Sequence, residues 1–177
     1  RIQAIPFRQP TLLLVVEGSK TIELNDKKWD MQAGDVFIVP ADTTLWLSNF
    51  PNQESNNYFG VAVGFCLETL SQFRNQYGSY INSWDISTTW HAAAPDSVIT
   101  ALLQWVELCQ DQPVKNQISQ HRRVELLLLL AQAGIAGNVL LNQHASWRQR
   151  VSHAISLELS RAWKIEDICY FESTTAN

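Results

Sequence analysis

The chain has 177 residues, 46% of them hydrophobic, which is enough for one sizeable domain or for a compact domain with part of a second. Its net charge of −4 argues against a protein whose whole surface binds nucleic acid. The three cysteines form no pair and have no metal-binding spacing, which favours a reducing compartment. Because no stretch resembles a membrane span or a secretory signal, we expect a soluble, cytoplasmic protein with no membrane partner.

The chain up to about residue 66 alternates short apolar stretches with turn residues. Six strands are expected, at about residues 11–16, 20–25, 28–32, 33–40, 45–49 and 58–66. The most informative motif is GDVFIVP at residues 34–40, in which a Gly-Asp turn precedes an apolar strand and a proline. Such a turn is typical of a chain that reverses before a strand buried on both faces. Strands this close together predict a small sandwich or barrel.

From Pro95 onward the apolar residues recur with the period of a helix. Val98, Leu102 and Trp105 form the stripe of one helix. A second helix is expected at 116–133, with an apolar stripe made by Val124, Leu127, Leu128 and Ala131. The second half of this helix is apolar nearly all round. A helix of this kind is covered on more than one side, so the stripe is assigned to a homodimer interface, with burial inside one chain as the alternative.

No catalytic or metal-binding constellation is found in the sequence. The four histidines are His91, His121, His144 and His153, and their wide spacing does not offer three or four converging ligands to a metal ion. The chain also lacks a nucleophile elbow and a glycine-rich phosphate loop. We therefore expect no catalytic residue, no metal site, no cofactor and no enzymatic activity.

A third helix is expected from Trp147, and it leads into the closing segment WKIEDIC. In that segment Trp163, Ile165, Asp167, Ile168 and Cys169 follow a Trp-x-[Leu/Ile]-x-Asp-[Ile/Val]-[Ala/Cys] pattern. The pattern resembles the start of the DNA-binding domain of AraC/XylS-type transcription regulators. The resemblance implies a helix-turn-helix whose recognition helix is not in this chain. No residue of this chain is therefore expected to contact DNA, and DNA is a partner only of the full-length protein.

The same resemblance implies the organisation of the whole chain. The expected fold is α+β, a cupin-like β jelly-roll barrel followed by a helical pair and the start of an all-α helix-turn-helix module. The corresponding boundaries are 1–90 for the barrel, 91–135 for the helical pair used in dimerisation, 136–146 for a linker and 147–177 for the truncated DNA-binding domain. The predicted function is effector sensing and dimerisation for a bacterial regulator. A domain that senses a protein partner and a metal-free cupin enzyme are the alternatives.

The inside of a small barrel is filled by side chains or holds one small ligand. The candidate lining residues are apolar or aromatic, with one cation for an acidic ligand. They are Arg8, Leu14, Val16, Phe37, Trp46 and Tyr58. This set predicts a small apolar or acidic effector.

Overall fold

The computed structural model describes residues 3–111, 115–141, 151, 155 and 164. The chain divides into two compact units, Arg1–Leu141 and Asn142–Asn177, and every helix and strand named below belongs to the first. In the described part of the chain, no helix has the length and apolar character needed to cross a membrane.

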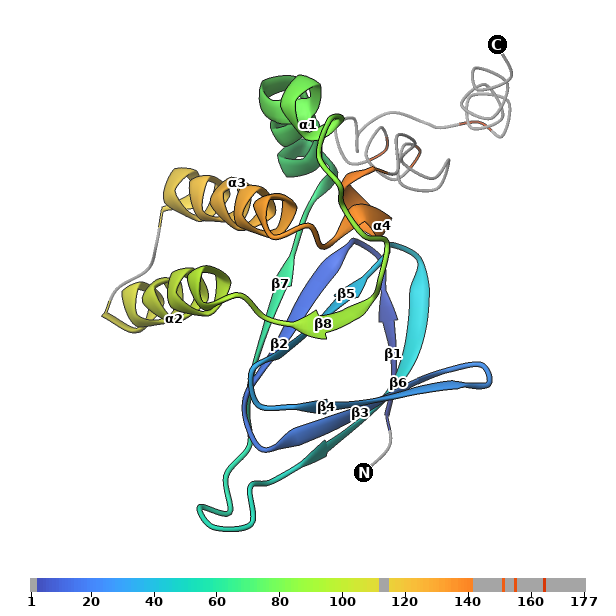
Figure 1. The fold of residues 1–177 in the computed structure, drawn as a ribbon, viewed down its shortest axis with the longest axis vertical. Helices are drawn as coiled ribbons and strands as arrows, with labels where there is room; N and C mark the ends of the chain where they lie inside the picture. The colour runs from blue at the N-terminus through green and yellow to red at the C-terminus, as the bar shows by residue number, and fades with distance from the viewer. Residues whose placement is uncertain (1–2, 112–114, 142–150, 152–154, 156–163, 165–177) are drawn as a thin grey trace. The chain divides into compact units, whose positions relative to one another are not determined.

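The strands of the first unit form two antiparallel sheets of four strands each (Figure 1). The first sheet has the order β1 (Gln3–Phe7), β6 (Thr43–Phe50), β3 (Ser19–Leu24) and β4 (Lys27–Gln32). The second has the order β7 (Phe59–Gly64), β2 (Thr11–Glu17), β5 (Asp35–Val39) and β8 (His91–Ala93). The six expected strands are present as β2 to β7, but the described residues make two separate sheets, and the expected closed barrel is not formed.

Side-chain alternation along β2 separates two hydrophobic cores. Leu13 lies opposite Phe37 of β5, and both side chains belong to the core between the two sheets. Leu14 lies opposite Val36, and these two belong to a core on the other face of the second sheet. Because β2 is buried on both faces, its sequence reads as a continuous apolar run.

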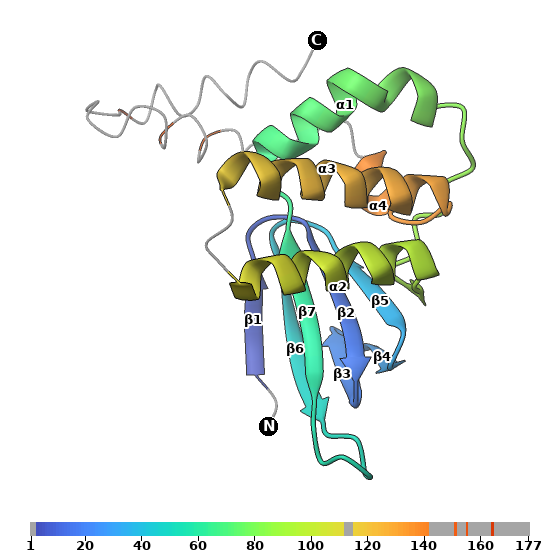
Figure 2. The same cartoon turned by 90° about the vertical axis from the view of Figure 1, so that its left-hand side faces the viewer.

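The helices of the described residues lie on the side of that other face and share its core (Figure 2). They are α1 (Leu67–Ile81), α2 (Asp96–Asp111), α3 (Asn116–Gln132) and the single turn α4 (Gly137–Leu140). The helices α2 and α3 confirm the two helical stripes expected from the sequence. Helix α1 was not expected, because residues 67–81 were included in the strand-rich barrel.

Two short elements extend the fold past the expected boundaries. The barrel was expected to end at residue 90, but β8 pairs with β5 and so belongs to the second sheet. A linker was expected at 136–146, but every residue of α4 is buried. Residues up to Leu141 are therefore part of the folded unit.

Candidate functional site

Lys20 of β3 is a lysine that points into the core between the two sheets. Only 8% of its surface is exposed. Its side chain is on the same face of β3 as that of Ile22, which is fully buried in that core. It also lies opposite Met31 of β4, which is buried there too. Lysine is almost never buried this far without a partner, so this side chain is the first candidate for a functional role.

Two neighbours hold the ammonium group of Lys20. Its Nζ donates a hydrogen bond to Oδ1 of Asn49, the residue directly opposite on β6. Nζ also lies 5.3 Å from the centre of the Tyr58 ring, a cation–π geometry. Tyr58 is half-buried and packs against the inter-sheet core just before β7. An amide oxygen and a ring face therefore stabilise the cation without neutralising it.

Burial shifts the ionisation of both titratable groups at this site. Removal from water lowers the pKa of Lys20, because the charged ammonium loses solvation. The same cause raises the pKa of Tyr58, whose neutral phenol is favoured. Among the described residues, no carboxylate lies within ion-pair distance of Lys20. The site thus presents a desolvated positive charge that a bound anion would stabilise.

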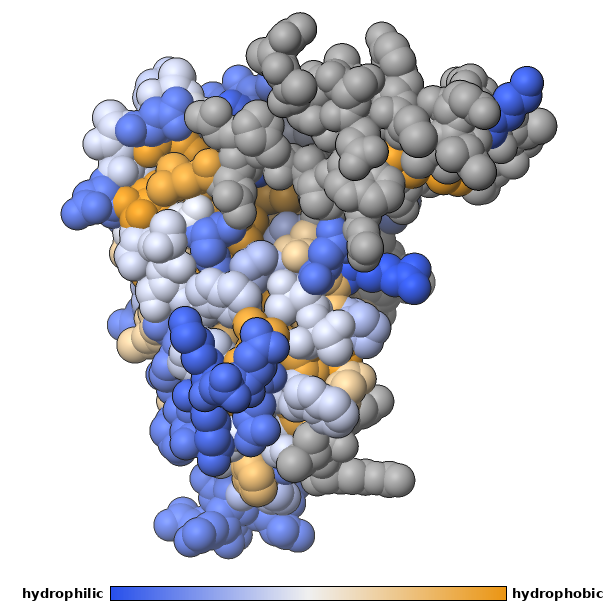
Figure 3. Space-filling view, turned by 90° about the vertical axis from the view of Figure 1, so that its right-hand side faces the viewer, coloured by the Kyte–Doolittle hydropathy of each residue, from blue (hydrophilic) through white to orange (hydrophobic). Residues whose placement is uncertain are grey.

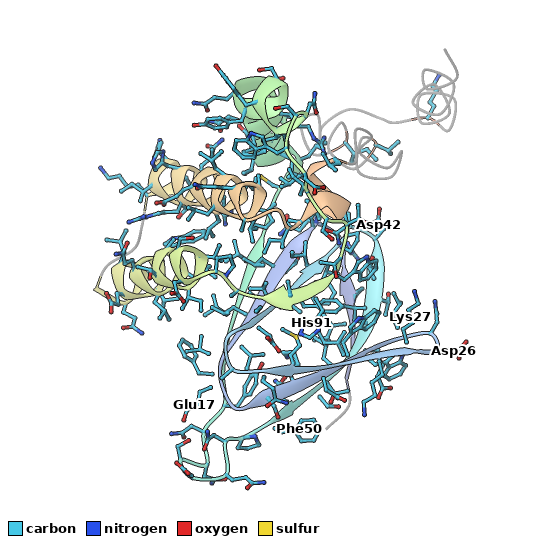
Figure 4. The ribbon with its side chains drawn as sticks, in the orientation of Figure 1. Glu17, Asp26, Lys27, Asp42, Phe50 and His91 are labelled. Atoms are coloured by element: carbon cyan, nitrogen blue, oxygen red, sulfur yellow. The ribbon has the colours of Figure 1, made fainter. Side chains whose placement is uncertain are left out.

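Close backbone packing shapes the end of the sheets where this site lies. Gly18 forms the turn from β2 to β3 at φ +83°, and a Cβ there would collide with the carbonyl oxygen of Phe50 and lie 3.1 Å from Cδ2 of Tyr58. Glu17 and Phe50 mark this end of the molecule (Figure 4). The Ser55 hydroxyl donates to a carboxylate oxygen of Glu17 and so ties the loop before Tyr58 to β2.

The acidic residue of the GDVFIVP segment, Asp35, has structural partners. The Asp35 carboxylate accepts a hydrogen bond from the Gln32 backbone N–H at 2.8 Å, and His91 of β8 lies 3.1 Å from the same oxygen. In the part of the chain that the structure describes, no group of three or more His, Cys, Asp or Glu residues is arranged to hold a metal ion. Asp35 and His91 therefore fasten β8 to β5.

Two hollows lie near the helices. One, of about 500 Å³, is a groove between α1 and α3 that includes Gln72, Gln120 and Leu128. The other, of about 360 Å³, lies between β7 and α2 and includes Arg123 of α3.

The side that carries the β3–β4 hairpin presents a mostly hydrophilic lower surface (Figure 3).

Residues 4–136 match the family model described as the AraC-type transcriptional regulator N-terminus. The chain belongs to the AraC-type transcription regulator family. Among curated proteins, no sequence match was found. The resemblance inferred from the closing segment is therefore confirmed by a match to a different part of the chain.

Solved structures of ToxT from Vibrio cholerae share the fold of this AraC-type region. An apo ToxT variant of strain SCE256 matches with 10% identity and a TM-score of 0.60, over 96% of this chain and 65% of ToxT. Wild-type ToxT of that strain, bound to an unsaturated fatty acid, matches with 12% identity and a TM-score of 0.59, over 96% and 63%. ToxT of O395, bound to (E)-4-(8-methylnaphthalen-1-yl)but-3-enoic acid, matches with 9% identity and a TM-score of 0.56, over 99% and 71%. This chain therefore spans about two thirds of the length of these proteins.

The six predicted lining residues of this AraC-type region are not brought together. Leu14 and Val16 belong to the core under the helices, whereas Phe37 belongs to the inter-sheet core and contacts Trp29 and Trp90 edge to face. Two others are open to solvent: Trp46 is 50% exposed and Arg8 is also exposed. Tyr58 alone lies in the site around Lys20.

The leucine-rich helix is mostly covered by its own chain. Val124, Leu127 and Ala131 are buried, with Leu127 at 0% exposure, so they are not available to a partner while this fold is intact. Leu128 is half-buried. The helix-turn-helix pattern of Trp163, Ile165, Asp167, Ile168 and Cys169 lies outside the described residues.

Sequence reasoning missed Lys20 and Asn49. The signal was present, because Lys20, Ile22 and Leu24 alternate on one face of the strand. That alternation puts Lys20 on the inward face, but a lysine at the start of a strand is ordinarily a solvated residue.

Proposed function

We propose that this chain is the effector-sensing region of an AraC-type transcription regulator, and that its effector is an organic acid whose carboxylate binds Lys20. The observation that carries the proposal is a buried lysine whose ammonium has no acidic partner among the described residues. A carboxylate at this position would form a charge-assisted hydrogen bond in a site of low dielectric constant. The Tyr58 hydroxyl is a second possible donor to that group.

The surroundings of Lys20 favour a ligand with an apolar body. Met31 lies opposite Lys20, and the neighbouring inter-sheet core includes Val15 and Leu47. Both ToxT complexes named above hold carboxylic acids with apolar bodies. This shared chemistry supports an acid of similar kind as the effector of this chain.

DNA binding is proposed for the full-length regulator and not for this chain alone. Residues 147–177 are proposed to be the first part of a helix-turn-helix domain, which supports a cytoplasmic regulator whose effector state controls DNA engagement. The family that the chain belongs to is one of transcription regulators, which favours a sensing function over catalysis.

We also propose that the chain dimerises through α3. Because the other predicted interface residues are buried, the proposed interface is the partly exposed side of the helix, where Leu128 lies. Leu128→Glu should lower the dimer fraction in sedimentation velocity if this side forms the interface. Leu141→Glu is the matched control, because Leu141 is 38% exposed and follows α4. A mass that stays the same in both variants would remove α3 from the interface.

The effector proposal is tested by isothermal titration calorimetry of the whole chain with palmitoleate, below its micelle concentration, and with the corresponding alcohol. The acid should bind, and Lys20→Met should weaken it about tenfold or more through loss of a charged hydrogen bond. Lys28→Met is the control, since the Lys28 side chain is 58% exposed on the next strand. Equal affinity in wild type and Lys20→Met would refute the assignment of Lys20.

A further inference from the structure

The cavity of about 360 Å³ between β7 and α2 has an apolar floor and an open rim. Val63, Leu102 and Trp105 make the floor, and all three are buried. Cys109 and Gln110 lie at the rim and are exposed. The volume is at the lower end of the range for small-molecule sites.

Arg123 of α3 brings a positive charge to this cavity. Its Nε–H donates to the carbonyl oxygen of Gly64 at 2.9 Å, and its guanidinium carbon lies 5.3 Å from the centre of the Trp105 ring. The neighbouring Arg122 pairs with Glu125 at 2.8 Å, whereas no carboxylate in the described part of the chain lies within ion-pair distance of Arg123. The outer nitrogens of its fork therefore keep donors for a ligand.

Trp105 adds an unsatisfied donor. The residue is 9% exposed, and its indole Nε1 is buried with no hydrogen-bond partner among the described residues. An indole N–H can only donate, and an unpaired buried donor is costly. The cavity thus has apolar walls and one cation, Arg123, whose outer nitrogens can donate, which is the complement of an acceptor anion on an apolar body.

We infer that this cavity binds a small monocarboxylate, with the carboxylate on the outer guanidinium nitrogens of Arg123 and the apolar body against Leu102 and Val63. A single cation among apolar walls suits one negative charge, and the planar fork suits the two oxygens of a carboxylate. This site is distinct from the Lys20 site. Val63 faces the core under the helices, whereas Lys20 shares its strand face with the core between the sheets.

A ligand here would touch three elements at once. Arg123 already joins α3 to the end of β7, and Trp105 belongs to α2. A carboxylate on Arg123 would therefore link the helical pair to the second sheet more tightly. The inference does not depend on the effector assignment of Lys20.

The test is a cysteine footprint on the whole chain, with octanoate as the probe and 1-octanol as its uncharged counterpart. Alkylation by iodoacetamide is followed by mass spectrometry at Cys109, with Cys66 as the internal reference because it is exposed and does not line the cavity. Octanoate should slow alkylation of Cys109 saturably, by about fivefold at four times its Kd. Cys66 should react at its usual rate, and 1-octanol should protect far more weakly.

Variants locate the ligand. Arg123→Gln should abolish the protection, whereas Arg122→Gln should keep it. Since Arg123 also holds β7, Val106→Trp provides a second variant that fills the cavity from α2 and should abolish protection with the Arg123 contacts left in place.

Three results would overturn the inference. Equal protection by 1-octanol would remove the carboxylate requirement. Protection that is lost in Lys20→Met and kept in Arg123→Gln would place the acid at the effector site instead. Protection that rises with protein concentration in the absence of octanoate would show that a second copy of the chain covers the cavity.

Discussion

The Asn138 side chain donates a hydrogen bond from Nδ2 to the carbonyl oxygen of Ile38 at 2.9 Å and thereby fastens α4 to β5 across one hundred residues of sequence. The backbone makes a similar junction beside it. The Gly137 N–H donates to the Ser87 carbonyl at 2.8 Å, and a Cβ on Gly137 would lie 2.8 Å from the carbonyl oxygens of Ile86 and Ser87. The segment after α3 therefore belongs to the folded unit.

Asn138→Ala should lower the free energy of unfolding by about 1–3 kcal/mol, because it leaves a buried carbonyl without its donor. Denaturant unfolding followed by circular dichroism measures the change. Asn75→Ala is the control: Asn75 is exposed on α1, so its substitution should change stability by about 0.5 kcal/mol or less. Equal stabilities for the two variants would show that α4 contributes little to the fold.

Periodicity in the sequence was enough to find most of the long elements of this fold, with helix α1 as the exception. The strands from β2 to β7 and the helices α2 and α3 each repeat an apolar pattern at their own period. Helix α1 carries such a pattern too, in Leu70, Phe73, Tyr77 and Ile81, but its other positions hold many residues of low helix propensity. Strand β8 has three residues, which is too short for any period to be read.

The candidate site was harder to predict than the fold, because it depends on which core a side chain joins. Alternation shows that Leu14 and Phe37 are buried, but only the pairing of β2 with β5 shows that they enter different cores. Leu45 and Leu47 point inward, so Trp46 between them points outward. The alternation of side chains along the strand was enough to predict this. The burial of Lys20 depends on the partner sheet, which no local pattern describes.

Leu127 and Leu128 should respond differently to truncation although they are neighbours on α3. Leu127→Ala removes a fully buried side chain and should cost about 2–5 kcal/mol of unfolding free energy. Leu128→Ala should cost less than half as much, because Leu128 is half-buried. Chemical denaturation of both variants measures the two losses of unfolding free energy. Equal losses would mean that Leu128 is covered, as in a stable dimer.

Gly18→Ala should destabilise the protein by about 2 kcal/mol or more, since alanine is strained at positive φ and its Cβ would collide with the Phe50 carbonyl. Gly78→Ala is the matched control. Gly78 lies in α1, and a Cβ added there would meet no atom within 4 Å, so alanine should stabilise the helix by up to about 1 kcal/mol. Thermal unfolding of the two variants should therefore move in opposite directions, and a parallel shift would contradict the close packing at Gly18.

Lys20→Met should leave the free energy of unfolding unchanged or raise it by about 1 kcal/mol, because methionine fills the same space without a buried charge. Asn49 is exposed and can bond to water in place of the ammonium. The same variant should lose affinity for the acid, which separates binding from folding. A loss of more than about 2 kcal/mol in urea titration would instead make Lys20 a structural residue.

Acid binding at Lys20 should depend on pH in a predictable direction. Burial lowers the pKa of Lys20 below its ordinary value of 10.5 in the free protein, and a bound carboxylate would raise that pKa again by stabilising the ammonium. Affinity should therefore be full below the pKa of the free protein and fall as the pH rises through it, by at most about tenfold per pH unit. At the acid end, affinity should also fall once the ligand's own carboxylate is protonated, below about pH 5.

Two variants assign the alkaline loss of affinity to a residue. Lys20→Arg keeps a charge that does not titrate in this range, so it should move the loss to higher pH. Tyr58→Phe should leave the loss at the same pH, because it removes the other titratable group of the site. The measurement is the Kd for palmitoleate from calorimetry between pH 6 and about pH 10, a range set by these side-chain pKa values. An alkaline loss that disappears in Tyr58→Phe would assign the titration to the phenol and contradict the role given to the ammonium.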